Sequence, residues 1–206
     1  MPDYDLDRAY ELKDKDEVQD LYGNWAETYD NSFGEGWGFV APREIAKLYL
    51  KNSNGDEPIL DIGAGTGLVT EHLEGAVTDA FDITPKMLEK AATKNIYRNL
   101  IEGDLLATLP FEDGTYGGVI SCGTFTHGHV GPECLPELLR VTKPGGLFVC
   151  GTIPSFLDKS GFGSALALLV ARAQITPVAF TDIQIYDNPD HPHSADRGLV
   201  MVFRKI

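Results

Sequence analysis

The chain has 206 residues, of which 17 are Lys or Arg and 31 are Asp or Glu, so its formal net charge is −14. This length is typical of one domain, and a hydrophobic fraction of 43% argues against a largely disordered chain. The acidic balance weighs against a protein that grips nucleic acid phosphates or anionic lipid through clustered Lys and Arg.

The first 30 residues hold ten acids against three bases and carry half of the net charge. Apolar residues such as Leu6, Tyr10 and Leu21 recur at roughly helical spacing, which predicts a polar helix with a thin apolar stripe. The charged start lacks the apolar core of a signal peptide, and no apolar run approaches the roughly 20 residues of a membrane span. Three widely spaced cysteines are interpreted as reduced thiols. We therefore expect a cytoplasmic protein without membrane association.

A glycine-rich loop over 31–38 precedes a helix expected from Pro42 to about Leu50. From Pro58 onward, short apolar runs alternate with helical patterns, which is typical of parallel strands joined by helical crossovers. The expected strands span 59–62, 76–81, 97–101, 116–122 and 146–152, and the expected helices span 68–73, 85–94 and 133–141. A helix over 161–175 and two successive strands, 178–186 and 198–204, then predict an antiparallel pair at one sheet edge.

The most informative stretch is ILDIGAGTGLVTEHL, residues 59–73. Its three glycines permit a tight turn between a strand and a helix, and they let a ligand touch the backbone at the helix N-terminus. A nicotinamide dinucleotide site would need glycine or alanine at Leu68. The Asp61 carboxylate would repel a pyrophosphate but accept hydrogen bonds from an ammonium group. The turn is therefore expected to hold a ligand with a cationic part and no phosphate.

Two further acids follow or end expected strands. Asp82 ends the second strand at the offset of a ribose-binding acid, where a carboxylate can accept both ribose hydroxyls. Asp104 follows the third strand and could reach an adenine amino group, with Ile83, Met87 and Leu105 as apolar walls. Because open α/β sheets bind ligands at the carboxyl ends of their strands, these acids predict a nucleoside site.

The successive motifs ILDIGAGTG, FDITPKML, IEGDLLATLPF and LLRVTKPGG strongly resemble those of class I S-adenosylmethionine-dependent methyltransferases. The resemblance covers residues 58–152. It implies an α/β fold with a Rossmann-like, doubly wound, seven-stranded sheet, mostly parallel with the last strand antiparallel. It also implies that the glycine turn holds the methionine moiety of S-adenosylmethionine, Asp82 the ribose, and Asp104 with Leu105 the adenine.

A second resemblance covers more of the chain. The segments LYGNWAETYD (21–30) and CGTFTHGHVG (122–131) are similar to the Williams–Beuren syndrome region methyltransferase-like proteins. The resemblance places the N-terminal segment over the cofactor as a lid that includes Trp25 and Tyr29. We expect an N-terminal helical cap over 1–57 and an S-adenosylmethionine-binding domain over 58–206. One departure from the class I pattern is Gly117, which follows an aromatic residue where many members carry Asp.

The residues expected to contact the cofactor are Trp25, Tyr29, Asp61, Gly63, Ala64, Gly65, Thr66, Gly67, Asp82, Ile83, Met87, Asp104, Leu105, Ser121 and Cys122. His127 is the candidate catalytic base, because imidazole titrates near neutrality, and His129 is the second choice. The alternative is that His127 only packs on the cofactor or caps the next helix. A base role predicts that turnover, rather than cofactor affinity, depends on it. The pair His191 and His193 matches no zinc spacing, and we expect no metal.

The first hypothesis is a methyltransferase that uses S-adenosylmethionine to methylate a small-molecule acceptor by in-line displacement. No large insertion separates the strands, and an acidic surface repels anionic macromolecules. The acceptor is therefore expected to be small and neutral or cationic, and not a nucleic acid. The alternatives are a non-catalytic S-adenosylmethionine-binding protein that acts through a partner, and a nicotinamide oxidoreductase, which Leu68 and Asp61 disfavour. The sequence leaves open the acceptor atom and the oligomeric state.

Overall fold

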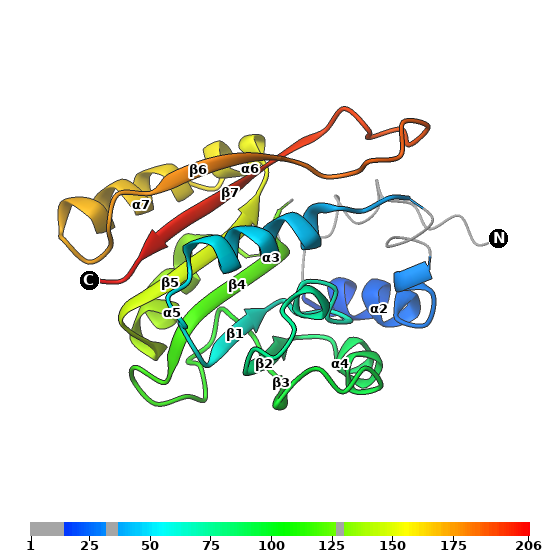
Figure 1. The fold of residues 1–206 in the computed structure, drawn as a ribbon, viewed down its shortest axis with the longest axis horizontal. Helices are drawn as coiled ribbons and strands as arrows, with labels where there is room; N and C mark the ends of the chain where they lie inside the picture. Colours follow the sequence, from blue (N-terminus) through cyan, green and yellow to red (C-terminus); the bar gives the residue numbers. More distant parts are fainter. Residues whose placement is uncertain (1–14, 32–36, 127–129) are drawn as a thin grey trace.

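The computed structural model describes residues 15–31, 37–126 and 130–206 (Figure 1). Its centre is a seven-stranded sheet in the order β3-β2-β1-β4-β5-β7-β6. The strands are β1 (Ile59–Ile62), β2 (Thr78–Asp82), β3 (Asn99–Glu102), β4 (Tyr116–Phe125), β5 (Thr142–Thr152), β6 (Ala179–Gln184) and β7 (Arg197–Arg204). β1 to β5 pair in parallel, whereas β7 runs antiparallel to both β5 and β6. This arrangement confirms the predicted sheet and its antiparallel edge pair.

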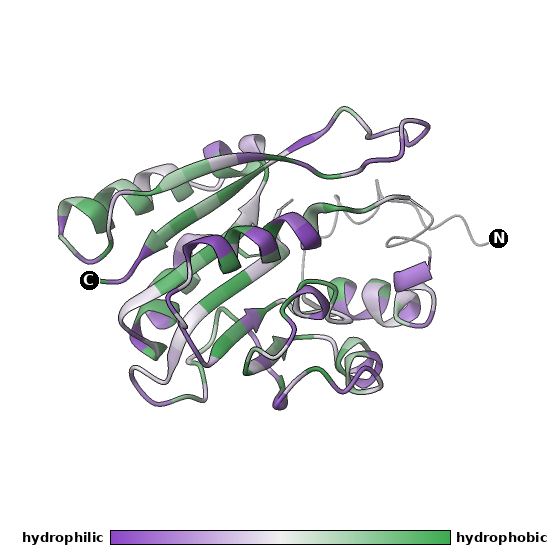
Figure 2. Ribbon diagram, viewed as in Figure 1, coloured by the Kyte–Doolittle hydropathy of each residue, from purple (hydrophilic) through white to green (hydrophobic). Residues whose placement is uncertain are grey.

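Helices lie on both faces of this sheet, and α2 lies beyond its strand ends (Figure 1). The described helices are α2 (Lys15–Trp25), α3 (Ala41–Asn52), α4 (Pro85–Ala92), α5 (Leu135–Val141), α6 (Pro154–Lys159) and α7 (Phe162–Ala171). Side chains alternate along β5, so Leu147 and Val149 join the core beside α3 while Phe148 and Cys150 join the core that contains α5 and α7. Because both faces are buried, the central strands are apolar nearly throughout, and α7 is apolar as well (Figure 2).

Two adjacent glycines in β4 let α3 and the segment that follows it lie against the sheet. A Cβ on Gly118 would lie 2.0 Å from the Tyr49 hydroxyl oxygen, and one on Gly117 would lie 2.6 Å from the Glu57 backbone nitrogen. The departure from the class I pattern at Gly117 therefore has a steric reason. The predicted cap over 1–57 includes α3, but α3 packs on β4 and β5. The division of the chain at residue 57 stays a prediction.

The predicted helix over 68–73 is wrong. This segment forms only a short 3₁₀ helix, η2 (Thr70–His72), between two glycines with positive φ, Gly67 at +94° and Gly75 at +79°. Glycines with positive φ interrupt helices, and here they flank a segment that forms only one 3₁₀ turn. A ligand at the glycine turn must therefore be held by backbone and side chains rather than by the N-terminus of a long helix.

Two other expectations concern the whole chain. In the described ranges, no helix combines the length and the apolar character needed to span a bilayer. The three cysteines, Cys122, Cys134 and Cys150, are all free thiols.

The predicted helix over 161–175 is observed as the shorter α7. A further helix, α6, precedes it and was not predicted from the sequence.

Candidate active site

The glycine turn, residues 63–67, follows β1 and contains three glycines with positive φ. Gly63 is tied to the neighbouring strand, because its N–H donates to the Phe81 carbonyl oxygen at 2.8 Å. A Cβ on Gly63 would lie 2.0 Å from Oγ1 of Thr124, and one on Gly67 would lie 3.0 Å from Tyr97. A Cβ on Gly65 would meet no atom within 4 Å. The two outer glycines thus pack against protein, and Gly65 presents its backbone to open space that a ligand can enter.

Asp82 ends β2 directly beside this turn. Its Oδ2 accepts the Gly65 N–H at 2.8 Å, and its Oδ1 accepts the Thr84 N–H at 2.8 Å. Burial raises the pKa of Asp82, and these backbone bonds oppose the rise. The predicted ribose acid and the middle glycine are therefore in direct contact at the carboxyl end of the sheet.

Asp61 lies below the turn and is 1% exposed. Its Oδ2 accepts hydrogen bonds from the Thr70 hydroxyl at 2.8 Å and from the Tyr97 hydroxyl at 2.7 Å. Burial raises the pKa of Asp61 to about 7. Sequence reasoning missed both hydroxyl partners, since Tyr97 had been assigned to a strand and nothing local in the sequence links it to Asp61.

The predicted adenine walls lie on the other side of Asp82. Leu105 and Met87 are buried, Ile83 is half-buried, and Asp104 is half-buried with its Oδ1 accepting the Leu106 N–H at 2.8 Å. The structure thus gathers these residues near the ends of β2 and β3. Together with the open backbone at Gly65, the acids and apolar walls fit a nucleoside with a cationic amino-acid tail.

The N-terminal segment covers this region. α2 packs on α4, and Gln19 donates from Nε2 to the Ile83 carbonyl oxygen at 2.6 Å. Trp25 is 2% exposed and packs with Met87 and Tyr186. Its ring centroid lies 6.3 Å from that of Tyr29. Trp25 therefore anchors the segment over α4, and its action as a lid on a bound cofactor stays a prediction.

A polar cluster that the sequence analysis missed joins this segment to the glycine turn. Thr66 of the turn donates its hydroxyl hydrogen bond to Asp30, and the Asp30 Oδ2 also lies 2.7 Å from Lys94 Nζ. Lys94 lies 2.6 Å from the Glu71 carboxylate as well. Thr66 is 1% exposed, so its contact with Asp30 is interior. We call Asp30, Thr66 and Lys94 the latch.

The end of β4 lies next to the turn on its other side. Ser121 and Thr124 both donate side-chain hydrogen bonds to the Ile62 carbonyl oxygen, at 3.0 and 2.9 Å, and so brace the residue before Gly63. Ser121 is fully buried, so its hydroxyl supports the turn and does not line a cleft. Cys122 is half-buried and does line a cavity, and burial raises the pKa of its thiol.

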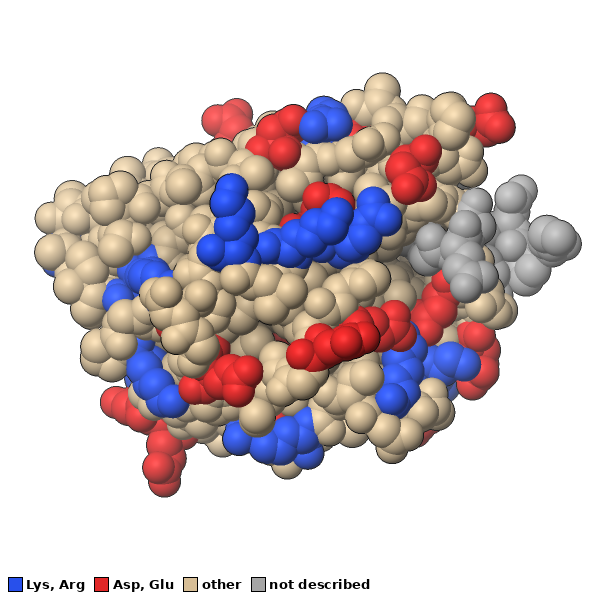
Figure 3. Space-filling model, viewed as in Figure 1, with Lys and Arg blue, Asp and Glu red and all other residues tan. Residues whose placement is uncertain are grey.

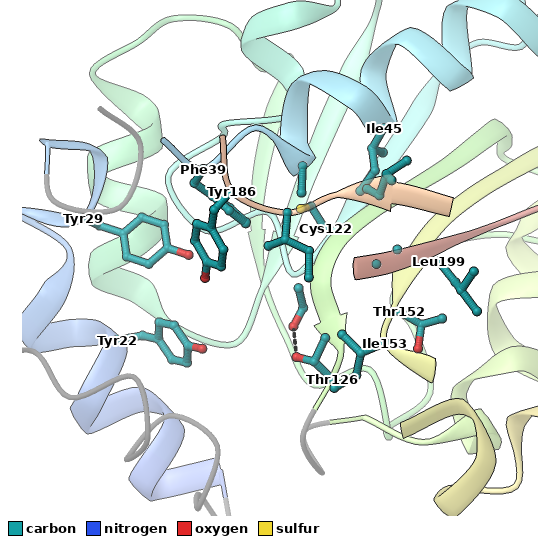
Figure 4. A pocket seen from close by; sticks show the side chains of 16 residues that line it. Tyr22, Tyr29, Phe39, Ile45, Cys122, Thr126, Thr152, Ile153, Tyr186 and Leu199 are labelled. Carbon is teal, nitrogen blue, oxygen red and sulfur yellow. Dashed lines mark hydrogen bonds between the residues drawn. The ribbon is translucent and has the colours of Figure 1, made fainter. Parts of the chain in front are cut away.

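That cavity lies between the N-terminal segment and the ends of β4 to β7 (Figure 4). Its volume is about 720 Å³, including its open mouth. Its described lining consists of Tyr22, Tyr29, Phe39, Ala41, Ile45, Cys122, Gly123, Thr126, Gly151, Thr152, Ile153, Ile183, Ile185, Tyr186, Gly198 and Leu199. None of these residues carries a charge. Figure 4 shows Tyr22 and Tyr29 approaching from the N-terminal segment, opposite Thr126 and Ile153. We call this cavity the uncharged pocket.

The histidine predictions have different outcomes. His127 and His129 lie outside the described residues, so their predicted roles are not tested. His191 is 6% exposed and stacks on Tyr186, with ring centroids 4.1 Å apart, so it is part of an aromatic cluster. In the part of the chain that the structure describes, no three His, Cys, Asp or Glu side chains are grouped to hold a metal.

Comparison with known proteins identifies relatives of this chain. The family described as a methyltransferase domain matches residues 60–150. Human methyltransferase-like protein 27 is 33% identical over 173 residues, which cover 81% of this chain and 69% of that protein. The demethylmenaquinone methyltransferase of Tropheryma whipplei is 30% identical, covering 70% of this chain and 63% of that protein. The bovine 18S rRNA (guanine-N(7))-methyltransferase is 40% identical over 70 residues, 32% of this chain and 25% of that protein.

Solved structures share the fold at lower identity. One is a methyltransferase in complex with the Haloferax volcanii Trm112 methyltransferase activator, with a TM-score of 0.66, 19% identity, and coverage of 91% of this chain and 97% of that one. Another is a TehB-like S-adenosylmethionine-dependent methyltransferase from Corynebacterium glutamicum, with a TM-score of 0.61, 19% identity, and coverage of 90% and 98%.

These relatives correct one expectation. From the sequence we predicted a small-molecule acceptor and no nucleic acid, whereas the relatives include rRNA methyltransferases. The error lies in treating the net charge of the whole chain as the charge of its surface everywhere. Arg43, Lys47 and Lys51 stand one turn apart on the exposed side of α3, and Figure 3 shows a row of basic side chains across the middle of the viewed face. A chain of net charge −14 therefore still has basic local surface.

Proposed function

Because this chain belongs to the class I S-adenosylmethionine-dependent methyltransferases, we propose that it holds S-adenosylmethionine across the glycine turn and Asp82 and methylates an acceptor that enters the uncharged pocket. The observation that carries this proposal is the 2.8 Å hydrogen bond from the Gly65 N–H to Asp82 Oδ2. It joins two motifs 17 residues apart at the carboxyl end of the sheet, beside open space. Bound S-adenosylmethionine supplies a methyl group on a positively charged sulfur.

In this proposal, the chain's own residues bind and orient the cofactor. Asp82 accepts hydrogen bonds from the ribose hydroxyls, and Asp104 with Leu105 holds the adenine. The backbone of Gly65 lies against the methionine moiety, whose ammonium group Asp61 attracts from below. Because Asp61 is buried, its negative charge acts on the ligand through a medium of low polarity, where charges interact more strongly than in water.

The N-terminal segment and the uncharged pocket exclude water and hold the acceptor. The N-terminal segment, anchored by Trp25, covers the cofactor region and excludes water from it. Tyr29 and Cys122 lie at the junction between that region and the uncharged pocket, so an acceptor in the pocket is held close to the reacting end. Holding two reactants in contact accounts for much of the rate of a displacement reaction. His127 stays the candidate base for an acceptor that must lose a proton.

The cofactor assignment predicts that Asp82→Ala weakens binding of S-adenosylhomocysteine at least about tenfold, because hydrogen bonds to a carboxylate are worth about 1.5–3 kcal/mol. Isothermal titration calorimetry measures this change. The control is Glu89→Ala, which removes an exposed acid from α4. Affinity unchanged in Asp82→Ala, or reduced equally in both variants, contradicts the ribose assignment.

Turnover is tested separately from binding. Labelled S-adenosylmethionine is incubated with the wild-type chain and a cell extract that contains both metabolites and RNA. Labelled product of either kind supports the enzyme. Repeated absence of product, with intact binding of S-adenosylhomocysteine, favours the non-catalytic alternative.

A further inference from the structure

The uncharged pocket differs in composition from the chain around it. Charged residues make up 23% of the sequence, yet the described lining has none. Burial raises the pKa of Tyr29, which lines the pocket, so its phenol stays neutral at physiological pH. Moving a charged group out of water without a partner costs several kcal/mol. The lining therefore disfavours an acceptor group that brings a charge into the pocket.

Aromatic rings from separate segments form one side of the pocket. The centroids of Tyr22 and Tyr29 lie 6.3 Å apart at 58°, and those of Phe39 and Tyr186 lie 5.6 Å apart at 38°. Rings at such distances offer flat apolar faces and hydrogen-bearing edges to a further ring. Branched aliphatic side chains, among them Ile153, line the opposite side.

The floor of the pocket adjoins the glycine turn. Cys122 and Gly123 follow Ser121 and precede Thr124, whose hydroxyls both bind the carbonyl oxygen of Ile62, the residue before the turn. Gly123 has a φ of +87°, and a Cβ there would meet no atom within 4 Å. A flat group resting on this floor lies beside the cofactor site.

Building on the proposed function, we propose that the group accepting the methyl is part of an uncharged planar ring, stacked against the aromatic side of the pocket. The ring chemistry is the same whether the ring is free or is a base within RNA. The rim is open, so the rest of the acceptor extends into solvent.

The proposal is tested by calorimetry with the full chain, saturated with S-adenosylhomocysteine. The probes are matched ring pairs that differ by a carboxylate, 1-naphthol with 1-hydroxy-2-naphthoate and indole with indole-3-carboxylate. Guanosine and a short guanine-containing RNA oligonucleotide complete the panel. We expect each neutral ring to bind at least tenfold more tightly than its carboxylate counterpart. Binding of guanine only within the oligonucleotide supports the proposal and assigns the ring to RNA.

A charge introduced at the pocket should reverse this preference. Ile153 is half-buried, and Ile153→Lys places an ammonium group among the lining residues. We expect this variant to bind the two carboxylates at least tenfold more tightly than the wild type does. Ile153→Met controls for side-chain length, and Leu168→Lys adds the same charge on the exposed side of α7. Both controls should keep the preference for neutral rings.

The outcomes distinguish a failure of the ring proposal from a failure of the proposed function. Measurable but equal binding of neutral and charged rings, tighter binding of the carboxylates by the wild type, or no binding of any neutral ring, free or in RNA, overturns the ring proposal. An unchanged preference in Ile153→Lys overturns it as well. A wild-type chain that fails to bind S-adenosylhomocysteine instead contradicts the proposed function.

Discussion

At the scale of single residues, Asp61 shows how a motif acid acquires properties that its neighbours in sequence do not reveal. Its carboxylate is buried, and two hydroxyl groups, from Thr70 and Tyr97, donate to the same oxygen. Desolvation outweighs these bonds and raises the pKa to about 7. The charge that we propose to attract the methionine ammonium is therefore costly to the free protein near neutral pH.

This cost predicts a pH dependence of stability. The folded pKa of Asp61 is about 7 against an ordinary value of 3.8, so the folded state binds a proton more tightly than the unfolded state. The contribution of Asp61 to stability is therefore greatest below pH 4 and is lost as pH rises towards 7. From pH 5 to pH 8, we expect the wild type to lose roughly 2–3 kcal/mol relative to Asp61→Asn, at about 1.4 kcal/mol per pKa unit.

Urea unfolding of both proteins without ligand, at several pH values, measures this difference. Asn keeps an oxygen that can accept the hydrogen bonds of Thr70 and Tyr97, so the variant isolates the ionisation. Parallel stability curves for the two proteins would show that Asp61 does not titrate in this range.

At the scale of elements, the latch connects three parts of the chain. Asp30 follows α2, Thr66 belongs to the glycine turn, and Lys94 follows α4. The side chains of Lys94 and Asp30 are 15% and 24% exposed, so their ion pair is partly shielded from water. Together with the bond from Gln19 to Ile83, the latch holds the N-terminal segment over the cofactor region at two separate points.

The latch predicts that Asp30→Asn speeds the dissociation of S-adenosylhomocysteine. The substitution removes the ion pair with Lys94 but keeps an acceptor for Thr66. Loss of about 1 kcal/mol corresponds to roughly fivefold faster release. Stopped-flow tryptophan fluorescence follows the release.

Glu27→Gln is the matched control for this experiment. It changes an acid of the same segment that is 90% exposed and 3.8 Å from Lys90, so release should be unchanged. Equal release rates in the wild type and Asp30→Asn would show that the latch does not restrain the lid.

At the scale of the whole molecule, α3 and the segment that follows it connect β4, β5 and β7, which lie far apart in the sequence. Tyr49 passes over Gly118 of β4, and its hydroxyl donates to the Asp56 carbonyl oxygen. Asp56 in turn pairs with Arg204 of β7 at 2.9 Å. β7 and the segment before β1 are thereby connected across the sheet.

This packing predicts that Gly118→Ala destabilises the protein by about 1–3 kcal/mol, because the added methyl group overlaps Tyr49 in the core. Thermal or urea unfolding measures the change. Gly163→Ala provides the control, since it lies in α7 where an added Cβ meets no atom within 4 Å. We expect that substitution to stabilise by up to about 1 kcal/mol. Equal effects of the two substitutions would contradict the close contact over Gly118.

The glycine turn, the strand over 59–62 and the antiparallel edge pair could be predicted from the sequence, because each depends on residues close together in the chain. Apolar alternation, glycine spacing and an acid at a strand end are local patterns. The helix over 68–73 failed for a local reason too, since Gly67 and Gly75 adopt a left-handed backbone that the apolar pattern does not reveal.

The tertiary structure alone decided which distant residues meet. Asp61 and Tyr97 are 36 residues apart, as are Asp30 and Thr66, and nothing in either local sequence specifies its partner. The uncharged pocket likewise forms only where the N-terminal segment meets the ends of four strands. The sequence predicted the glycine turn and the strand-end acids that we propose to bind the cofactor, because these are local patterns. Three-dimensional packing determined the uncharged pocket, because its lining comes from segments that approach one another only when the sheet is complete.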